Sequence, residues 1–226
     1  MKPSTKSSIQ RGFTIIELMI ATAVFSTILL VVLTAITQIG RMYYKGLTTS
    51  QTQEVARTVL DRMSQEVQFS GQAGTPITVT AGPNGLICIG KSRFFFIINK
   101  LSHPSQHALW ADTDNDNTGC TAVTLNAFVA NANTANPTAA GNNGAELLAD
   151  GMRIVVLNAT TGANNLWAIN VKVVFGADDL VEAIDATGTT VSQAAFPQFT
   201  VCKGSQIGTQ FCAISQLTTT VLKRVP

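Results

Sequence analysis

The chain has 226 residues, of which 46% are hydrophobic and 12% are charged, and its formal net charge is +2. Three of its positive charges lie within the first 11 residues, so the rest of the chain is close to neutral and lacks the basic face that binding to nucleic acid requires. About 155 residues follow the predicted N-terminal helix, enough for one domain with its own core.

The first predicted element is a long helix that begins near Phe13. A basic, polar segment at residues 1–12 ends in Gly12, and the 27 residues Phe13–Ile39 contain a single charge, Glu17. At about 1.5 Å per residue this helix is roughly 40 Å long and can cross a bilayer. An isolated carboxylate costs on the order of 2.5–3.5 kcal/mol at the bilayer centre, so Glu17 is expected to have a function. The basic start predicts that this end stays in the cytoplasm.

The helix is predicted to continue through residues 40–70 in amphipathic form. Apolar residues recur along one face at intervals of four or eight, and they are Leu47, Val55, Val59, Met63 and Val67. Oppositely charged residues four positions apart mark the outer face. The pattern therefore predicts one helix from Phe13 to about Ser70, apolar all round in its first half and packed on a domain in its second half.

Beyond Gly71 the pattern changes to short apolar runs and alternating residues, which are typical of strands. The predicted strands are Ile77–Ala81, Leu86–Ile89, Phe94–Ile98, Ala108–Ala111, Thr121–Val129, Leu147–Leu157, Leu166–Phe175, Gln198–Cys202, Gln210–Ile214 and Leu217–Val225. Residues 112–119 and 131–144 are predicted surface loops. A long helix followed by an antiparallel sheet is an α+β fold.

The junction between Gly12 and Phe13, followed by Glu17, resembles the N-terminus of type IV prepilins and type II secretion prepseudopilins. In that family a dedicated peptidase cuts after the glycine and methylates the new N-terminal residue, usually Phe, and the fifth mature residue is Glu. The resemblance implies cleavage between Gly12 and Phe13, N-methylation of Phe13 and a role of Glu17 in assembly. It also implies the pilin architecture of a long helix packed on an antiparallel sheet.

Two other kinds of export segment remain as alternatives. An ordinary export signal is cut after an apolar run of about 7–15 residues, whereas here the run is longer and follows the Gly12–Phe13 junction. An uncleaved signal anchor fits the length of the run, but it does not require Glu17.

The resemblance divides the chain into four segments. They are a prepilin leader at residues 1–12, a transmembrane and filament-core helix at 13–39, an amphipathic helix packed on the domain at 40–70, and a periplasmic β-rich domain at 71–226. Ala149-Asp150-Gly151 before a strand, Trp167 in the next strand and Val221–Arg224 at the end are loosely similar to PilW-like minor pilins and J-type minor pseudopilins. Major pilins usually carry a proline in the apolar run, and this run has none.

Four cysteines, Cys88, Cys120, Cys202 and Cys212, allow three disulfide pairings. Export, which the resemblance implies, favours disulfides over free thiols. A short C-terminal loop closed by a bond such as Cys202–Cys212 is common in pilins, and that bond would leave Cys88 to pair with Cys120.

Asp112, Asp114 and Asp116 place oxygens at positions 1, 3 and 5 of a calcium loop. The glycine at position 6 and the glutamate at position 12 of that loop are missing. Because some pseudopilins bind calcium in a domain loop, calcium is a candidate cofactor, and a solvated acidic turn is the alternative.

Two further motifs are predicted to have no chemical role. Gly85–Ser92 matches the letters of a phosphate-binding loop, but strand-like residues on both sides of Lys91 favour a β-hairpin. His103 and His107 lie beside Pro104 and are interpreted as loop residues rather than metal ligands.

The resemblance implies a non-enzymatic minor pilin that helps to initiate or shape the tip of a type IV pilus. Its expected partners are other major and minor pilins, the prepilin peptidase and the inner-membrane assembly platform. Its expected location is the inner membrane, with one membrane span and a periplasmic domain, and then the pilus or pseudopilus filament. The alternatives are a minor pseudopilin of a type II secretion system and a signal-anchored periplasmic binding module.

Overall fold

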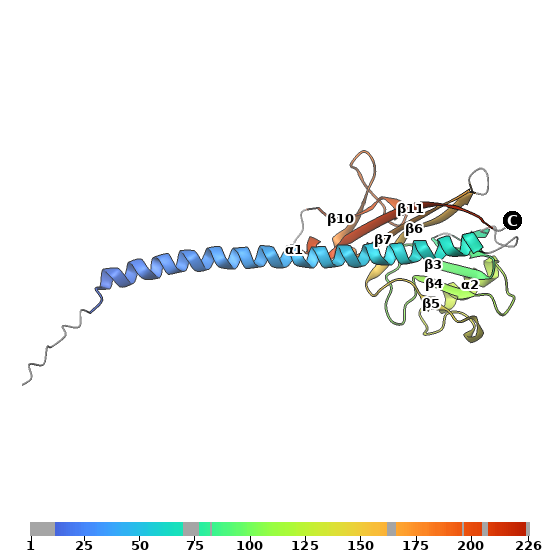
Figure 1. Cartoon of the computed structure of the whole chain (residues 1–226), viewed down its shortest axis with the longest axis horizontal. Helices are drawn as coiled ribbons and strands as arrows, with labels where there is room; N and C mark the ends of the chain where they lie inside the picture. Colours follow the sequence, from blue (N-terminus) through green and yellow to red (C-terminus); the bar gives the residue numbers. More distant parts are fainter. Residues whose placement is uncertain are drawn as a thin grey trace, which may run out of the picture. The chain divides into compact units, whose positions relative to one another are not determined.

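The computed structural model describes residues 12–69, 77–81, 83–161, 166–195, 197–204 and 208–224. Two compact units follow each other along the chain, residues 1–43 and residues 44–226. The described residues form a long N-terminal helix and a domain of antiparallel sheets (Figure 1), so the predicted α+β class is confirmed.

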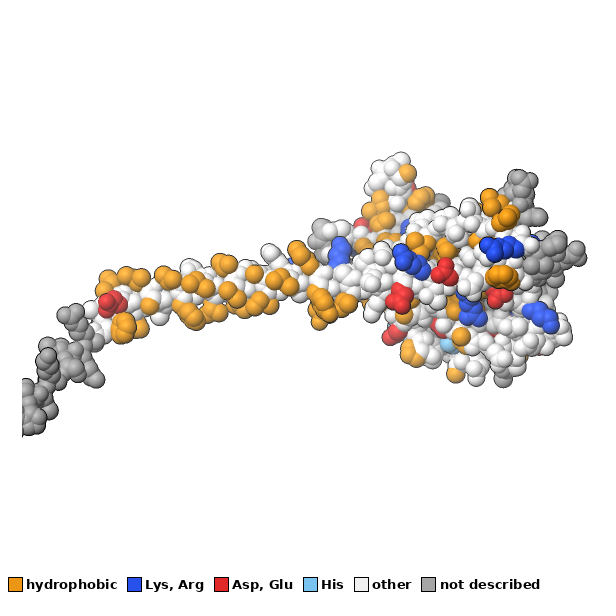
Figure 2. All heavy atoms as spheres, in the orientation of Figure 1, with side chains coloured by type: hydrophobic (Ala, Val, Ile, Leu, Met, Phe, Trp, Pro, Cys, Tyr) orange, Lys and Arg blue, Asp and Glu red, His pale blue; other side chains and the backbone are white. Residues whose placement is uncertain are grey.

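Helix α1 spans Ile15–Phe69 without a break, close to the predicted range, and its predicted end at Ser70 lies outside the described residues. In the first unit its apolar side chains are exposed all round the helix, as Figure 2 shows on one face. Among the described residues α1 is the one helix long and apolar enough to cross a membrane.

In the second unit, one stripe of α1 is buried. Its members are Thr48, Thr52, Ala56, Val59, Met63 and Val67, which recur every three or four residues. Leu47, which was predicted on this stripe, is 42% exposed, and Thr48 takes the buried position instead.

The first sheet has the strand order β1-β2-β3-β4-β5, and all neighbours are antiparallel. Its strands are β1 (Ile77–Ala81), β2 (Asn84–Ile89), β3 (Ser92–Ile97), β4 (Leu109–Thr113) and β5 (Ala145–Glu146). The first four lie close to their predicted positions, and β5 was not predicted.

Both faces of this sheet are buried, which explains why β2 and β3 are continuous apolar runs rather than alternating ones. Ile87 and Phe94 pack in the core that α1 shares with the sheets. Leu86 and Phe95 pack on the opposite face against helix α2 (Ala122–Asn131), where the ring of Phe95 stacks on Phe128 with centroids 4.8 Å apart.

Residues 121–129 form the N-cap and most of α2 and not a strand, so this prediction was wrong. The hydroxyl of Thr121 accepts a hydrogen bond from the backbone N–H of Thr124, which makes Thr121 the N-cap. Leu125 and Phe128, three residues apart, are buried on one side of the helix, and Val123 is 78% exposed. The cap and the helical spacing of buried residues therefore outweigh the β-propensity of Val123 and its neighbours.

The second sheet has the order β11-β7-β6, and the third has the order β10-β8-β9. Their strands are β6 (Met152–Thr161), β7 (Leu166–Phe175), β8 (Val181–Ile184), β9 (Thr190–Val191), β10 (Thr200–Cys202) and β11 (Ala213–Leu222). β7 matches its prediction. β11 is one strand where two were predicted, and β8 and β9 were missed.

Candidate functional site

The predicted processing site lies at the exposed start of α1. Gly12, Phe13 and Thr14 are exposed and precede the first helical residue, and Phe13 is 89% exposed. A Cβ built on Gly12 would meet no other atom within 4 Å. The fold of the chain therefore does not require glycine at position 12, and any requirement for it comes from another protein. Most of the predicted leader, residues 1–11, lies outside the described residues.

Glu17 and Thr14 form a capping box at the N-terminus of α1. The backbone N–H and the hydroxyl of Thr14 donate to Oε2 of Glu17 at 2.9 and 2.8 Å, and the backbone N–H of Glu17 donates to Oγ1 of Thr14 at 3.3 Å. This arrangement satisfies two backbone N–H groups that the helix itself leaves unpaired. Glu17 thus has a local function that even an uncleaved anchor could use.

Thr14 is a residue that the sequence interpretation missed, although the Thr-x-x-Glu signature of a capping box was present. Capping and charge are separate properties of Glu17. An experiment on Glu17 must therefore distinguish them.

The carboxylates that were predicted to bind calcium surround Arg93, which is 2% exposed. Nε and Nη2 of Arg93 donate to the two oxygens of Asp112, both at 2.8 Å, and Nη1 donates to Asp114 at 3.0 Å and Asp116 at 3.4 Å. Arg93 and Asp112 face each other across β3 and β4, so Asp112 belongs to a strand and not to the predicted loop. Burial opposes the charge of Arg93, but the hydrogen bonds and charges of the three aspartates outweigh burial and raise its pKa.

The other oxygens of this acidic segment also have donors. The backbone N–H of Gly119 donates to Oδ2 of Asp114, and Nδ2 of Asn142 donates to Oδ2 of Asp116, both at 3.1 Å. The hydrogen bond from Asn142, followed by those from Thr118, holds the pKa of Asp116 well below its ordinary value.

A calcium ion at this site would have to replace the hydrogen bonds that the aspartates already accept. Every carboxylate oxygen of the three aspartates already accepts a hydrogen bond, and a second cation would lie against the guanidinium of Arg93. Among the residues that the structure describes, no group of three His, Cys, Asp or Glu side chains is arranged to hold a metal. In this arrangement a buried arginine supplies positive charge to the three aspartates, and calcium binding by Asp112, Asp114 and Asp116 stays a prediction.

The phosphate-loop letters at Gly85–Ser92 form the β2–β3 hairpin, as expected. A Cβ at Gly85 would collide with the ring of Phe96, so packing of the hairpin accounts for this glycine. The two histidines have different partners. Nδ1 of His103 lies 2.6 Å from Asp150, whereas Nε2 of His107 lies 3.0 Å from the carbonyl oxygen of Thr134.

Two disulfides join Cys88 to Cys120 and Cys202 to Cys212, the pairs favoured in the sequence analysis. Cys88 lies on β2, and Cys120 directly precedes the N-cap of α2, so the first bond fixes α2 beside the first sheet. Because all four cysteines are in disulfides, none provides a thiol for nucleophilic chemistry.

Glu146 and His107 form a buried pair that no local sequence pattern indicated. The backbone N–H groups of Ala108, Leu109 and Leu148 donate to the carboxylate of Glu146 at 2.9–3.2 Å, and Nδ1 of His107 lies 3.3 Å from its Oε2. Burial raises the pKa of Glu146 to about 7, although these hydrogen bonds and the charge of Lys100 oppose the increase. Burial also lowers the pKa of His107. Below about pH 7 the folded chain therefore favours a protonated Glu146, and burial disfavours the charged form of His107.

We predict that Glu146 makes the stability of the domain fall as the pH rises from 4.5 to about 7. In this window Glu146 keeps its proton in the folded state but has lost it in the unfolded state. The stabilisation that Glu146 gives the folded state is therefore fully present below pH 4.5 and is lost above about pH 7. Glu146→Gln, which cannot ionise, should remove this decline, on the order of 3 kcal/mol at most. The measurement is the Tm of the full chain in detergent at about pH 5 and about pH 7.5.

Exposed Glu54 on α1 offers a matched control, since Glu54→Gln should leave the pH dependence unchanged. His107 changes the stability in the opposite direction below pH 6.5, its ordinary pKa, because folding favours its neutral form. The test is therefore the difference between the pH profiles of the variants and not the shape of one profile alone. Identical pH profiles for Glu146→Gln and the unmodified chain would contradict the prediction.

A family model for the prokaryotic N-terminal methylation motif matches residues 7–33. The match contains Gly12, Phe13 and Glu17, together with the first part of the exposed apolar run of α1. Searches of curated proteins and of solved structures gave no match. The family model covers the methylation motif alone, and this motif, the apolar helix that follows it and the antiparallel sheets together support a likeness to the type IV prepilin-like family.

Proposed function

We propose that this chain is a minor pilin, a non-enzymatic structural subunit that helps to initiate or shape the tip of a type IV pilus. The observation that carries the proposal is the methylation motif joined to a helix whose apolar side chains are exposed all round. An apolar surface of this extent needs a cover of lipid or of other apolar helices. In a pilin the apolar helix is surrounded first by the lipid of the inner membrane and then by the helix bundle of the filament.

The proposed sequence of events begins with processing. Prepilin peptidase removes the leader, residues 1–12, and methylates Phe13. Residues 13–39 hold the chain in the inner membrane as a single span, residues 40–70 pack on the domain, and the β-rich domain at 71–226 lies in the periplasm. The inner-membrane assembly platform then moves the subunit into a filament beside other major and minor pilins.

A minor pseudopilin of a type II secretion system is the alternative within the same family. The loose similarity of Ala149–Gly151, Trp167 and Val221–Arg224 to both PilW-like and J-type subunits favours neither. Crosslinking in membranes distinguishes them, because each alternative predicts a different set of neighbouring subunits. The third candidate, a signal-anchored periplasmic binding module, predicts an uncut N-terminus.

We further propose that the charge of Glu17 pairs with the N-terminal amine of Phe13 in the preceding subunit. A carboxylate in the first turn gains about 0.3–1 kcal/mol from its own helix dipole, and the hydrogen bonds to Thr14 add to this gain. This is less than the cost of about 2.5–3.5 kcal/mol at the bilayer centre. A positive partner within the bundle would compensate the charge and set the axial register of the helices.

Three variants separate this charge from capping. Glu17→Ala removes both, Glu17→Gln removes the charge but can still complete a capping box, and Thr14→Ala weakens the cap but keeps the charge. We expect all three to be cut after Gly12. We expect both Glu17 variants to crosslink poorly to partner pilins in membranes and Thr14→Ala to crosslink normally.

The opposite pattern would assign Glu17 to capping alone. If Glu17→Gln assembles as well as the unmodified chain while Thr14→Ala fails, no ion pair between subunits is needed. Normal assembly of all three variants would show that Glu17 has neither role in the filament.

A further inference from the structure

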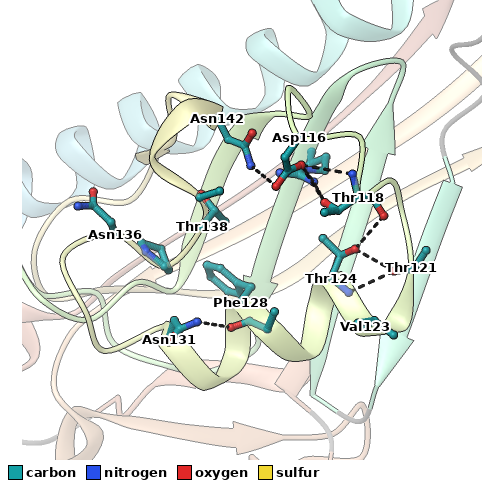
Figure 3. A pocket seen from close by; sticks show the side chains of 14 residues that line it. Asp116, Thr118, Thr121, Val123, Thr124, Phe128, Asn131, Asn136, Thr138 and Asn142 are labelled. Carbon is teal, nitrogen blue, oxygen red and sulfur yellow. Dashed lines mark hydrogen bonds and ion pairs between the residues drawn. The ribbon is translucent and has the colours of Figure 1, made fainter.

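A cavity of about 620 Å³ lies in the domain beside α2, and none of the features discussed for pilus assembly uses it. Figure 3 shows its surroundings: one side of α2, the segment from Asp116 to Thr121, and the loop that carries Asn136, Thr138 and Asn142. Its volume lies within the range of about 300–1,000 Å³ that is usual for small-molecule sites.

The loop that lines one side of the cavity is held in place by hydrogen bonds to the sheet and to the acidic segment. Nε1 of Trp110 donates to the hydroxyl of Thr138 at 3.1 Å, and Nδ2 of Asn142 donates to Asp116 at 3.1 Å. Nδ2 of Asn115 also donates to the carbonyl oxygen of Gly141 at 2.8 Å. A ligand would therefore meet a formed wall and would not have to order the loop, which is a large cost in many binding reactions.

The floor and one side of the cavity are apolar. The ring of Phe128 lines the cavity and is backed by Phe95, and Val123, Ala127 and Pro137 extend the apolar surface. Val123 is 78% exposed, so this surface continues to the rim of the cavity. A ligand with an apolar face can cover it.

Around Phe128 lie three polar side chains with unused hydrogen-bonding capacity (Figure 3). Among the described residues, the amide of Asn136 has no hydrogen-bond partner. Asn131 donates through Nδ2 to the carbonyl oxygen of Ala127, and its Oδ1 remains without a donor. The hydroxyl of Thr138 accepts from Trp110 and can still donate its own hydrogen. The lining therefore offers both donors and acceptors.

Charge narrows the class of ligand. The charged lining residues, Arg93 and Asp116, belong to a cluster of one arginine and three aspartates, so the nearby charge is negative and disfavours anions. A fully apolar ligand would cover the free amide groups of Asn131 and Asn136 without forming hydrogen bonds to them. The lost hydrogen bonds to water would weaken the binding of such a ligand. A sugar ring has both an apolar C–H face and hydroxyl groups that donate and accept hydrogen bonds.

We infer that this cavity is a binding site for a small uncharged sugar. The apolar face of the sugar lies on Phe128 and Ala127, and its hydroxyl groups bond to Asn131, Asn136 and Thr138. The inference does not depend on the proposed function, because the cavity is built entirely from the domain.

The test compares two tryptophan variants on α2. Ala127 lines the cavity, whereas Ala130 is exposed on the same helix and does not line it, so Ala127→Trp fills the site and Ala130→Trp is the matched control. Binding is measured by saturation-transfer NMR and calorimetry on the full chain, in a detergent without a sugar headgroup. The probes are the methyl glycosides of glucose, galactose, mannose and N-acetylglucosamine, with methyl glucuronoside as the anionic comparison and cyclohexanol as the apolar one.

We expect at least one neutral glycoside to bind, with Kd of about 1 mM or lower. Ala127→Trp should weaken this binding about tenfold or more, Ala130→Trp should leave it within about twofold, and the glucuronoside should bind less tightly than its neutral counterpart. Asn136→Leu, at an exposed position, should also weaken binding, and melting curves show whether each variant is folded.

Three results would overturn the inference. The first is that no neutral glycoside binds at concentrations of about 20 mM, well above the expected Kd. The second is equal binding by the two tryptophan variants. The third is tighter binding of cyclohexanol than of every sugar, which would identify an apolar pocket instead.

Discussion

Arg93→Met is expected to lower the stability of the domain by about 3–5 kcal/mol, a large part of the roughly 5–15 kcal/mol that stabilises a folded domain. Met roughly preserves the length of the apolar part of the side chain but has no charge and no donors. The side chain of Asp112, which is 0% exposed, would lose both of its hydrogen bonds from Arg93 and remain as a buried unpaired carboxylate. Asp114 and Asp116 would then stand close to it without the central cation.

The effect can be measured by thermal and chemical unfolding of the full chain in detergent. Arg57→Met is the matched control, because Arg57 is an exposed arginine on α1, and such surface changes usually stay within about 0.5 kcal/mol. The double variant Arg93→Met with Asp112→Leu should recover part of the loss, since it removes the buried unpaired charge. Arg93→Lys should be intermediate, because lysine keeps the charge but cannot form the two parallel bonds to Asp112.

Equal stability of Arg93→Met and Arg57→Met would contradict this account of the cluster. The same outcome would reopen the question of what the three aspartates bind. If the double variant is no more stable than Arg93→Met, the unpaired carboxylate is not the cause of the lost stability. The cause would then be lost packing against Phe95, whose ring centre lies 5.4 Å from the guanidinium.

The N-terminal half of the chain was predictable because its signals are local. A long apolar run, a Gly-Phe junction and a stripe of apolar residues each lie within a few helical turns, so α1 could be predicted to within a few residues of Ile15–Phe69. Strong hairpin patterns also placed β2 and β3, and the long alternating run placed β7. The capping box was equally local, and the Thr14-x-x-Glu17 signature would have revealed it.

The parts that could not be predicted depend on residues brought together by the fold. Arg93 lies well before the aspartates in the sequence, and the register of β3 with β4 places it opposite Asp112. Without that register, three alternating aspartates resemble a cation site. Glu146 meets His107 in a similar way, through the pairing of β5 with β4. α2 was missed because β-branched residues have a strong strand propensity, and its amphipathic side became clear only against the sheet.

Gly12→Leu is expected to abolish cleavage, so that the chain remains in the membrane as the full 226-residue precursor. The cause lies outside the chain, because a Cβ at position 12 would meet no atom within 4 Å and the capping box of Thr14 and Glu17 begins two residues later. A leucine should therefore leave the fold unchanged and interfere only with a peptidase that accepts glycine before the cut. Intact-mass analysis after co-expression with a prepilin peptidase measures the loss of residues 1–12 and the methyl group on Phe13.

Gly40→Leu is the matched control, since Gly40 also has open space where a Cβ would stand but lies inside α1, far from the junction. We expect this variant to be cut and methylated as fully as the unmodified chain. Normal cleavage of Gly12→Leu would refute processing by a prepilin peptidase at this junction. Failure of the unmodified chain to be cut would favour the signal-anchored module instead, in which the exposed apolar helix is only a membrane anchor and the capping box accounts for Glu17.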